Sequence, residues 1–190
     1  MILIGQYDSP FVRRVGIALH LYGIAYEKQP WSTFGDADKI APFNPLRRVP
    51  TLVLDDGEVV IESGAILDYV DEIVGADSAM IAKSGPRRRQ ALKVCALATG
   101  LADKAVSPVY ERVLHDAASE MWIDRCRTQI GGALDVLNAN RQAPYWFGDR
   151  IGLPGLFDPI RWPALAEHAS RCEALPAFQA VVQVFDPARK

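Results

Sequence analysis

The sequence predicts a protein of two domains, an α+β domain followed by an all-helical domain. Short β-forming runs occur only in the first 61 residues, where they alternate with helical patterns. Beyond Gly75 the apolar residues recur only at helical spacing. A chain of 190 residues, 49% of them hydrophobic, is long enough for two small cores. We therefore expect domains at residues 1–75 and 86–190, joined by a linker at residues 76–85.

The first domain is expected to begin with a strand, a helix and a second strand. Residues 2–4 have the apolar composition of a short buried strand. Apolar side chains then recur on one helical face from Val15 to Tyr22, and Gly23 ends this helix. Residues 24–27 form a weaker strand. Elements in this order predict a right-handed parallel crossover.

A hairpin and a further helix complete the first domain. Pro50 precedes a β-forming run, and an Asp-Gly turn at residues 56–57 separates it from a second run at residues 59–61. Apolar residues then follow a helical spacing from Ile66 to Val74. The order is βαβ and then ββα, which predicts a four-stranded mixed sheet with helices packed on it.

The two halves of this domain are separated by a long connection between Gln29 and Val49. Only residues 36–40 have a briefly helical pattern in it. Loops of this length are uncommon in compact domains and are often functional. We expect this connection to border a site.

The second domain is predicted to consist of antiparallel helices. Pro86 suits the first turn of a helix. Apolar stripes at helical spacing follow within residues 94–105 and 123–137. No strand pattern interrupts them.

Charge and hydropathy exclude several classes of partner. The chain has 21 Lys and Arg against 23 Asp and Glu, so nothing in its formal charge of -2 attracts nucleic acid or an anionic membrane. The basic run at residues 87–89 is interpreted as a solvated helix face. The chain has no apolar stretch of about 20 residues and no basic segment at its start. We expect a soluble cytoplasmic protein with no nucleic-acid or membrane partner.

Neither a metal nor a nucleotide cofactor is expected. The three cysteines lack Cys-x-x-Cys spacing, which fits thiols in a reducing compartment. The three histidines are scattered, and the sequence has no phosphate-binding glycine loop. These six residues are Cys95, Cys126, Cys172, His20, His115 and His168.

Two hydroxyl side chains lie at the predicted junction of the first strand and helix. Pro10 suits the first helical turn, so Ser9 is placed at or near the N-cap, with its hydroxyl beside unpaired backbone amides. Taken alone, this serine is a structural cap. Tyr7 supplies a competing hydroxyl at the end of the strand.

The second candidate is the Val49-Pro50 pair at the start of the hairpin. A trans Pro50 would be an ordinary residue at a strand end. A cis bond, found in about 5–6% of X-Pro pairs, would turn the N–H and C=O of Val49 out of the sheet. A peptide-like ligand could then pair with them as an added strand.

The third candidate is Glu62-Ser63, between the last strand and its helix. Ser63 is an N-cap candidate, and a helix N-terminus attracts a carboxylate. Glu62 beside it can hold an ammonium group. The pair therefore suits the α-amino and α-carboxylate groups of an amino acid.

A set of short motifs in a fixed order resembles those of the glutathione S-transferase family. They are Ser-Pro-Phe-Val-Arg-Arg-Val at 9–15, Asn44-Pro45 before Arg48-Val49-Pro50-Thr51-Leu52, Glu62-Ser63 with Ile66 and Tyr69, Gly148-Asp149-Arg150, and Cys172-Glu173-Ala174-Leu175-Pro176. Each is weak alone, and their order and spacing carry the resemblance. It implies a thioredoxin-like first domain and an all-helical second domain.

The resemblance also implies roles for the candidate residues. Ser9 would contact the glutathione sulfur, as in serine-type members, with Tyr7 as the alternative. The backbone of Val49 would pair with the cysteinyl unit, and Glu62 and Ser63 would hold the γ-glutamyl end. The remaining contacts are assigned to Phe11, Pro50 and either Arg48 or Arg47, the arginine approaching the glycyl carboxylate.

These roles predict an enzyme that adds glutathione, its co-substrate, to a small electrophile. Lowering a thiol pKa from about 8.5 by two units takes about 2.7 kcal/mol. A hydrogen bond to a charged acceptor contributes roughly 1.5–3 kcal/mol and a helix N-terminus roughly 0.3–1, so one hydroxyl there suffices.

Val106, Tyr110 and Leu114, at helical spacing, are candidates for the electrophile pocket, with core packing as the alternative. The resemblance implies a homodimer.

Two other functions stay open. A noncatalytic protein-interaction module of this fold would not need the residues that hold glutathione. A glutathione-dependent isomerase or dehalogenase would use the same site, although residues 9–11 lack the Ser-Ser-Cys run of the maleylacetoacetate isomerase branch. Because no cysteine precedes Cys95, disulfide exchange through a protein thiol is disfavoured.

The chain departs from the family pattern after Gly152. Leu153 and Pro154 stand where a cap and a central helix of about 11–12 residues are expected. Losing that helix would open a cavity at a cost approaching the stability of a domain, about 5–15 kcal/mol. We therefore expect that the helix is present in the protein but missing from the determined sequence near residues 152–153; a true deletion is the alternative.

Overall fold

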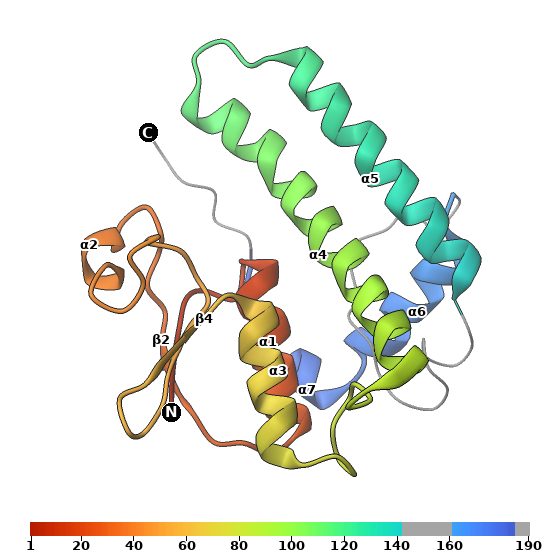
Figure 1. The fold of residues 1–190 in the computed structure, drawn as a ribbon. Coiled ribbons are helices and arrows are strands. Elements are labelled where there is room, and N and C mark those ends of the chain that lie inside the picture. Colours follow the sequence, from red (N-terminus) through yellow and green to blue (C-terminus); the bar gives the residue numbers. More distant parts are fainter. Residues whose placement is uncertain (142–160, 185–190) are drawn as a thin grey trace. The chain divides into compact units, whose positions relative to one another are not determined.

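The chain folds into two compact units, described here from a computed structural model (Figure 1). The structure describes residues 1–141 and 161–184. The first unit contains Met1–Ala79 together with the described residues from Pro176 onward, and the second contains the described part of Met80–Leu175.

The first unit is built on a four-stranded mixed sheet. Its strands are β1 (Ile2–Ile4), β2 (Glu27–Gln29), β3 (Thr51–Val53) and β4 (Val59–Ile61), in the order β2-β1-β3-β4. β2 runs parallel to β1, whereas β3 pairs antiparallel with β1 and with β4. The predicted βαβ-ββα order and mixed sheet are confirmed.

The second strand is displaced from its predicted position at residues 24–27. The preceding helix α1 (Pro10–Leu21) ends in a turn in which Gly23 has φ 65° and the Ile24 N–H donates to the Leu19 carbonyl at 2.9 Å. This is the hydrogen-bond pattern of a Schellman motif. Residues 24–26 therefore leave the helix, and pairing begins only at Glu27.

Helices α1 and α3 (Ser63–Val74) supply much of the core of the first unit and pack against each other (Figure 1). Their buried faces are mainly aliphatic because aliphatic residues recur at helical spacing, and Arg14 and Ser63 are the buried polar residues on them. The short α2 (Ala37–Ile40) interrupts the long connection, as predicted. Side chains with no exposed surface in this core are Leu3, Val12, Val15, Leu19, Ile40, Leu52, Ile66 and Val70.

A C-terminal segment completes the first unit. The short α7 (Pro176–Gln179) packs on α1, and Phe178 and Val181 have no exposed surface. The expected helical domain extended to residue 190, whereas the contacts group residues 176–184 with the sheet domain. Burial of these two apolar side chains against α1 accounts for the difference.

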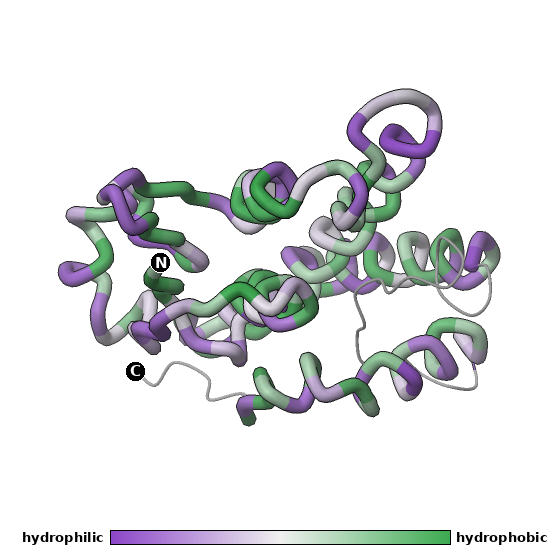
Figure 2. The backbone as a smooth tube through the Cα atoms, turned by 90° about the horizontal axis from the view of Figure 1, so that it is seen from below, coloured by the Kyte–Doolittle hydropathy of each residue, from purple (hydrophilic) through white to green (hydrophobic). Residues whose placement is uncertain are grey.

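The described part of the second unit is helical, as predicted. It contains α4 (Gly85–Leu114), α5 (Glu120–Asn140) and α6 (Pro163–Glu173). Apolar and polar residues are interleaved along the helices, as is typical of amphipathic packing (Figure 2). Their shared core contains Leu134, Leu137 and Leu165, with Val94, Leu97, Leu101 and Ile130 packed against it.

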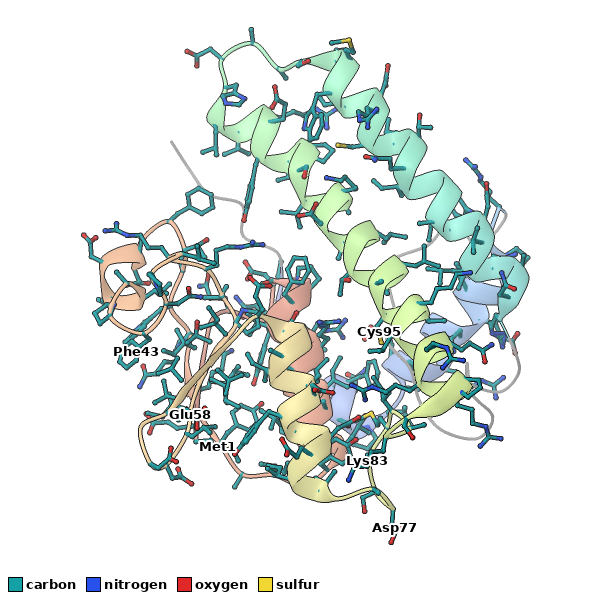
Figure 3. All side chains as sticks on the ribbon, viewed as in Figure 1. Met1, Phe43, Glu58, Asp77, Lys83 and Cys95 are labelled. Carbon is teal, nitrogen blue, oxygen red and sulfur yellow. The ribbon has the colours of Figure 1, made fainter. Side chains whose placement is uncertain are left out.

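A connection joins α3 to α4, and the two units divide within it, between Ala79 and Met80. It runs from Gly75 to Ser84, includes Asp77 and Lys83, and leads into α4, from which Cys95 projects (Figure 3). The departure from the family pattern after Gly152 lies outside the described residues, as does the Gly148-Asp149-Arg150 motif. Among the described helices, none is long and apolar enough to cross a membrane.

Candidate glutathione site

Ser9 is the N-cap of α1. Its backbone is extended, with φ -71° and ψ 121°, and its Oγ accepts a hydrogen bond from the Val12 N–H at 3.5 Å. Pro10 occupies the first helical position, as predicted. The cap uses the hydroxyl oxygen as an acceptor, so the hydroxyl proton can still be donated to a second group. A sulfur anion near the first turn would also face the positive end of the helix dipole.

Gly5 brings the start of α1 against the Val49 segment. It has φ 133°, and a Cβ built on it would lie 2.5 Å from Val12 Cγ2 and 2.9 Å from Val49 Cβ. No real side chain tolerates such contacts, so only glycine allows this approach. Sequence reasoning missed Gly5, although its position directly after the first strand was a visible signal.

The Val49-Pro50 peptide bond is cis. Of the two alternatives that the sequence left open, a trans and a cis Pro50, the structure has the cis form. The sheet ladder begins at Thr51, so Val49 lies outside it. Asn44, 1% exposed, donates through Nδ2 to the Arg48 carbonyl at 3.0 Å and to Thr51 Oγ1 at 3.2 Å. This buried amide holds both flanks of the cis turn.

The start of α3 differs in one detail from the expectation. Glu62 is at the N-cap position, and Ser63 is the first helical residue and only 3% exposed. Glu62 has φ 68°, an uncommon value for a residue with a side chain. Its carboxylate makes no side-chain cap hydrogen bond, so it is directed to other partners.

The two candidate arginines have different partners. Arg48 Nη1 lies 3.6 Å from Glu62 Oε1, and both side chains are about half exposed. Arg47 Nη1 instead donates to Asp38 Oδ1 at 2.9 Å. Arg48 therefore links the cis turn to the start of α3, and a cation and an anion lie side by side in the candidate site.

Tyr7 is anchored in the interior. Its side chain is 7% exposed, and its hydroxyl is hydrogen-bonded to that of Tyr26. Lys28 Nζ lies 3.6 Å from the centre of its ring. Burial raises the pKa of Tyr7, and the Tyr26 hydrogen bond offsets this only in part. Burial and Tyr7 itself also raise the pKa of Tyr26. Both hydroxyls therefore hold their protons tightly.

The remaining predicted residues lie on two helices, α1 and α4. Phe11 lies in the first turn of α1 and is partly buried. Val106, Tyr110 and Leu114 are all on α4, in the second unit. Tyr110 is 38% and Leu114 47% exposed, which disfavours core packing for these two side chains.

The described residues show no group of three side chains that could hold a metal ion. His168 and Cys172 have the i,i+4 spacing of a ligand pair, and His168 Nε2 lies 3.7 Å from Cys172 Sγ. Both are buried in α6, and burial raises the pKa of Cys172 to about 11. A thiol with so high a pKa is largely protonated and a poor ligand.

The fold and these residues define a class of protein with a thioredoxin-like domain, a cis-proline turn and a helical second unit. Residues 3–78 match the family model of the glutathione S-transferase N-terminal domain. The GST-like protein YibF of Escherichia coli is 36% identical over 138 residues, 72% of this chain and 68% of that protein. The maleylacetoacetate isomerase of Pseudomonas aeruginosa is 30% identical over 203 aligned positions, 94% of each chain. The chain belongs to the glutathione S-transferase family.

Solved structures agree with this assignment. A glutathione S-transferase from Methylobacterium radiotolerans, in complex with glutathione sulfonate, has a TM-score of 0.85 at 28% identity and covers 95% of this chain and 93% of its own. A family member from Pseudomonas fluorescens Pf-5 with bound glutathione has a TM-score of 0.78 at 27% identity and covers 95% and 97%.

The alignment with the isomerase bears on the length of this chain. It spans 203 positions but includes only 94% of a chain of 190 residues. The isomerase therefore carries residues within the aligned region that this chain lacks. We expect part of this difference to lie after Gly152, where the sequence departs from the family pattern.

Proposed function

We propose that this protein is a serine-type glutathione transferase, which binds glutathione in its first unit and adds the thiolate to a small electrophile. The observation that carries the proposal is the approach of the Ser9 helix start to the cis Val49-Pro50 turn through Gly5. A hydroxyl, a helix N-terminus and a peptide edge thereby share one small region.

Each part of glutathione is assigned to a group in this region. The Ser9 hydroxyl donates to the sulfur, and the backbone of Val49 pairs with the cysteinyl unit. Glu62 holds the γ-glutamyl ammonium, and the amides at Ser63 hold its carboxylate. Phe11, Pro50 and Arg48 complete the contacts, with Arg48 reaching toward the glycyl carboxylate.

Ser9 is preferred to Tyr7 as the sulfur contact because of their environments. The Tyr7 hydroxyl is bound to Tyr26 and its side chain is buried. Ser9 is only partly buried, and its oxygen makes a long cap bond of 3.5 Å. Its proton is therefore free to stabilise a sulfur anion.

The reaction follows from thiolate stabilisation. The thiol proton leaves to solvent, and the sulfur anion attacks an electrophilic carbon, either displacing a leaving group or adding to an activated double bond. Complete ionisation raises the rate by no more than about thirtyfold, because a free thiol is already a few per cent ionised at pH 7 and nucleophilicity falls with pKa. Positioning of the electrophile supplies the remainder. We assign Val106, Tyr110 and Leu114 of the second unit to that pocket.

A glutathione-dependent isomerase is the second candidate function. The similarity to maleylacetoacetate isomerase over 94% of both chains favours it. Isomerisation returns glutathione unchanged, whereas transfer consumes one glutathione per turnover. Glutathione consumption measured with 1-chloro-2,4-dinitrobenzene and with a cis-enedione substrate distinguishes the two.

The experiment that tests the main proposal is a glutathione titration by calorimetry on protein of verified mass. Thiolate absorbance is followed against pH for the wild type and Ser9→Ala. We expect wild-type binding with a lowered thiol pKa, and we expect Ser9→Ala to raise that pKa while binding persists. A folded protein that does not bind glutathione would contradict the proposal and favour the interaction-module alternative.

The proposal extends to assembly and location. We propose a cytoplasmic homodimer with a role in detoxification. Phe34 and Leu46, in the connection before the cis turn, are 47% and 59% exposed, and a dimer interface that covered them would remove apolar surface from water. Light scattering tests the dimer, which should have twice the mass that an intact-mass measurement gives for the single chain.

A further inference from the structure

The turn that carries Ser9 is held by a residue 176 positions further along the chain. The Tyr7 N–H donates to Gln183 Oε1 at 2.8 Å. The turn is closed by the Ser9 N–H, which donates to the Gln6 carbonyl at 3.2 Å. Tyr7 is the second residue of this turn. Its N–H takes no part in the hydrogen bond that closes the turn and instead donates to Gln183 in the C-terminal segment.

The same C-terminal segment also holds the helix that follows Ser9. The Val181 carbonyl accepts a hydrogen bond from Arg13 Nε at 3.4 Å. Val181 is fully buried, and its Cγ1 lies 3.1 Å from the position of a Cβ on Gly16. The segment thus contacts the chain on both sides of Ser9, before it at Tyr7 and after it on α1.

Tyr7 is in addition fixed at its other end. Its hydroxyl is bonded to Tyr26, and its ring packs over Gly16, where Cε1 would be 2.8 Å from an added Cβ. With its hydroxyl, ring and backbone N–H all engaged, Tyr7 is a rigid base for the turn. Gln183 contributes to this set from the C-terminal segment, 176 positions along the chain from Tyr7.

We propose that Gln183 is a positioning residue for Ser9, acting through the Tyr7 N–H to keep the serine hydroxyl directed at the glutathione sulfur. The inference rests on the proposed function of Ser9. A partly buried N–H that loses its acceptor must turn toward another partner or water. Ser9 is two residues away, and a hydrogen bond to a thiolate weakens steeply with misalignment.

Two variants at this position separate the acceptor from the rest of the side chain. Gln183→Met has nearly the same length but cannot accept strongly, whereas Gln183→Glu keeps an oxygen at the same place. Val182→Ala is the matched control, because Val182 is the neighbouring residue and is 59% exposed. Measurements at about 0.5 M salt screen the charge that Glu introduces.

The readout is kcat/KM for 1-chloro-2,4-dinitrobenzene against pH, with thiolate absorbance of bound glutathione. For Gln183→Met we expect a roughly two- to tenfold loss at pH 6.5. The loss should shrink toward parity at high pH, where the thiol ionises without help. Gln183→Glu should restore most of the activity, and Val182→Ala should match the wild type.

Other results would overturn the proposal. A Gln183→Met profile equal to the wild type at every pH shows that the contact does not position Ser9. A loss that is the same at every pH, with a lowered melting temperature, shows a purely structural role. A wild type that does not lower the thiol pKa refutes the proposed function itself, and this result is recognised before any Gln183 variant is measured.

Discussion

At the scale of single residues, the candidate site depends on close approaches that tolerate little change. At Gly5, the space between Val12 of α1 and Val49 of the cis turn is too small for a methyl group. Glu62 holds its carboxylate at the start of α3 from a left-handed backbone conformation. Both residues combine an unusual backbone with a specific neighbour, which is typical of functional positions.

Gly5→Ala should destabilise the protein by about 2–6 kcal/mol, because overpacking and a positive φ each cost roughly 1–3 kcal/mol. The new methyl group would push Val49 away from Val12, so glutathione affinity should fall as well. Urea unfolding and calorimetry measure the two effects.

Gly57→Ala is the control for this change. Gly57 has φ 92° and nothing within 4 Å of an added Cβ, so it reports backbone strain alone. Equal losses of stability for the two variants would show that the close approach at Gly5 is relaxed in solution.

Glu62→Gln should weaken glutathione binding by roughly three- to tenfold, because a partly exposed charge pair contributes about 1 kcal/mol. An analogue without the ammonium group, glutaryl-cysteinyl-glycine, should bind both proteins equally. Calorimetry with the two ligands gives the comparison.

Asp38→Asn is the matched control, since it removes one negative charge from a separate ion pair of the first unit, Arg47–Asp38. If Asp38→Asn weakened binding as much as Glu62→Gln, the effect would be one of net charge and the assignment of Glu62 to the ammonium would fail.

At the scale of elements, two asparagine side chains form hydrogen bonds with backbone groups that have no partner within their own helix or strand. One lies at the cis turn and the other at the start of α6. Asn44 holds the cis turn in the first unit. In the second unit, Asn138 of α5 accepts hydrogen bonds from the Ala164 and Leu165 N–H groups at 3.1 and 3.3 Å. Trp162, the N-cap of α6, makes no side-chain cap bond of its own, so Asn138 acts as its cap from a neighbouring helix.

Asn138→Ala should lower the free energy of unfolding by about 1–2 kcal/mol, the usual effect of removing an N-cap. Asn138→Asp keeps the acceptor oxygens and adds a favourable charge at a helix N-terminus, so it should retain the stability. Denaturant unfolding followed by circular dichroism measures both. Equal losses for the two variants would mean that Asn138 contributes packing and not a cap.

At the scale of the whole molecule, pH acts on stability through the paired tyrosines. The pKa values of Tyr7 and Tyr26 are raised by burial in the folded state. The folded protein therefore keeps these protons at pH values where the unfolded chain has lost them. Their contribution is complete below the unfolded pKa of about 10 and is lost as the pH rises above it.

The urea concentration at the midpoint of unfolding should therefore decrease as the pH is raised from 9 to 11. The double variant Tyr7→Phe/Tyr26→Phe should be less dependent on pH over this range, because it has no phenol to ionise at either position. A decline equally steep in the variant would assign the alkaline instability to other groups.

Much of the fold could be predicted because its signals are local. The Ser9-Pro10 start of α1, the hairpin around residues 56–57 and the helical stripes each depend on neighbours a few residues apart. The family resemblance also rests on short motifs in order. The second strand was misplaced because a helix exit and a strand start have similar compositions over three residues.

The sequence by itself determined the βαβ-ββα order, the helical second unit and the residue types of the candidate site. Tertiary structure alone decided the cis state of Val49-Pro50, the Glu62–Arg48 contact and the anchoring of Tyr7 by Gln183. It also decided that α7 packs with the first unit. The physical reason is sequence separation: hydrogen bonds and packing between segments as far apart as Tyr7 and Gln183 leave no periodic pattern in the chain, and they exist only once the fold has brought both segments together.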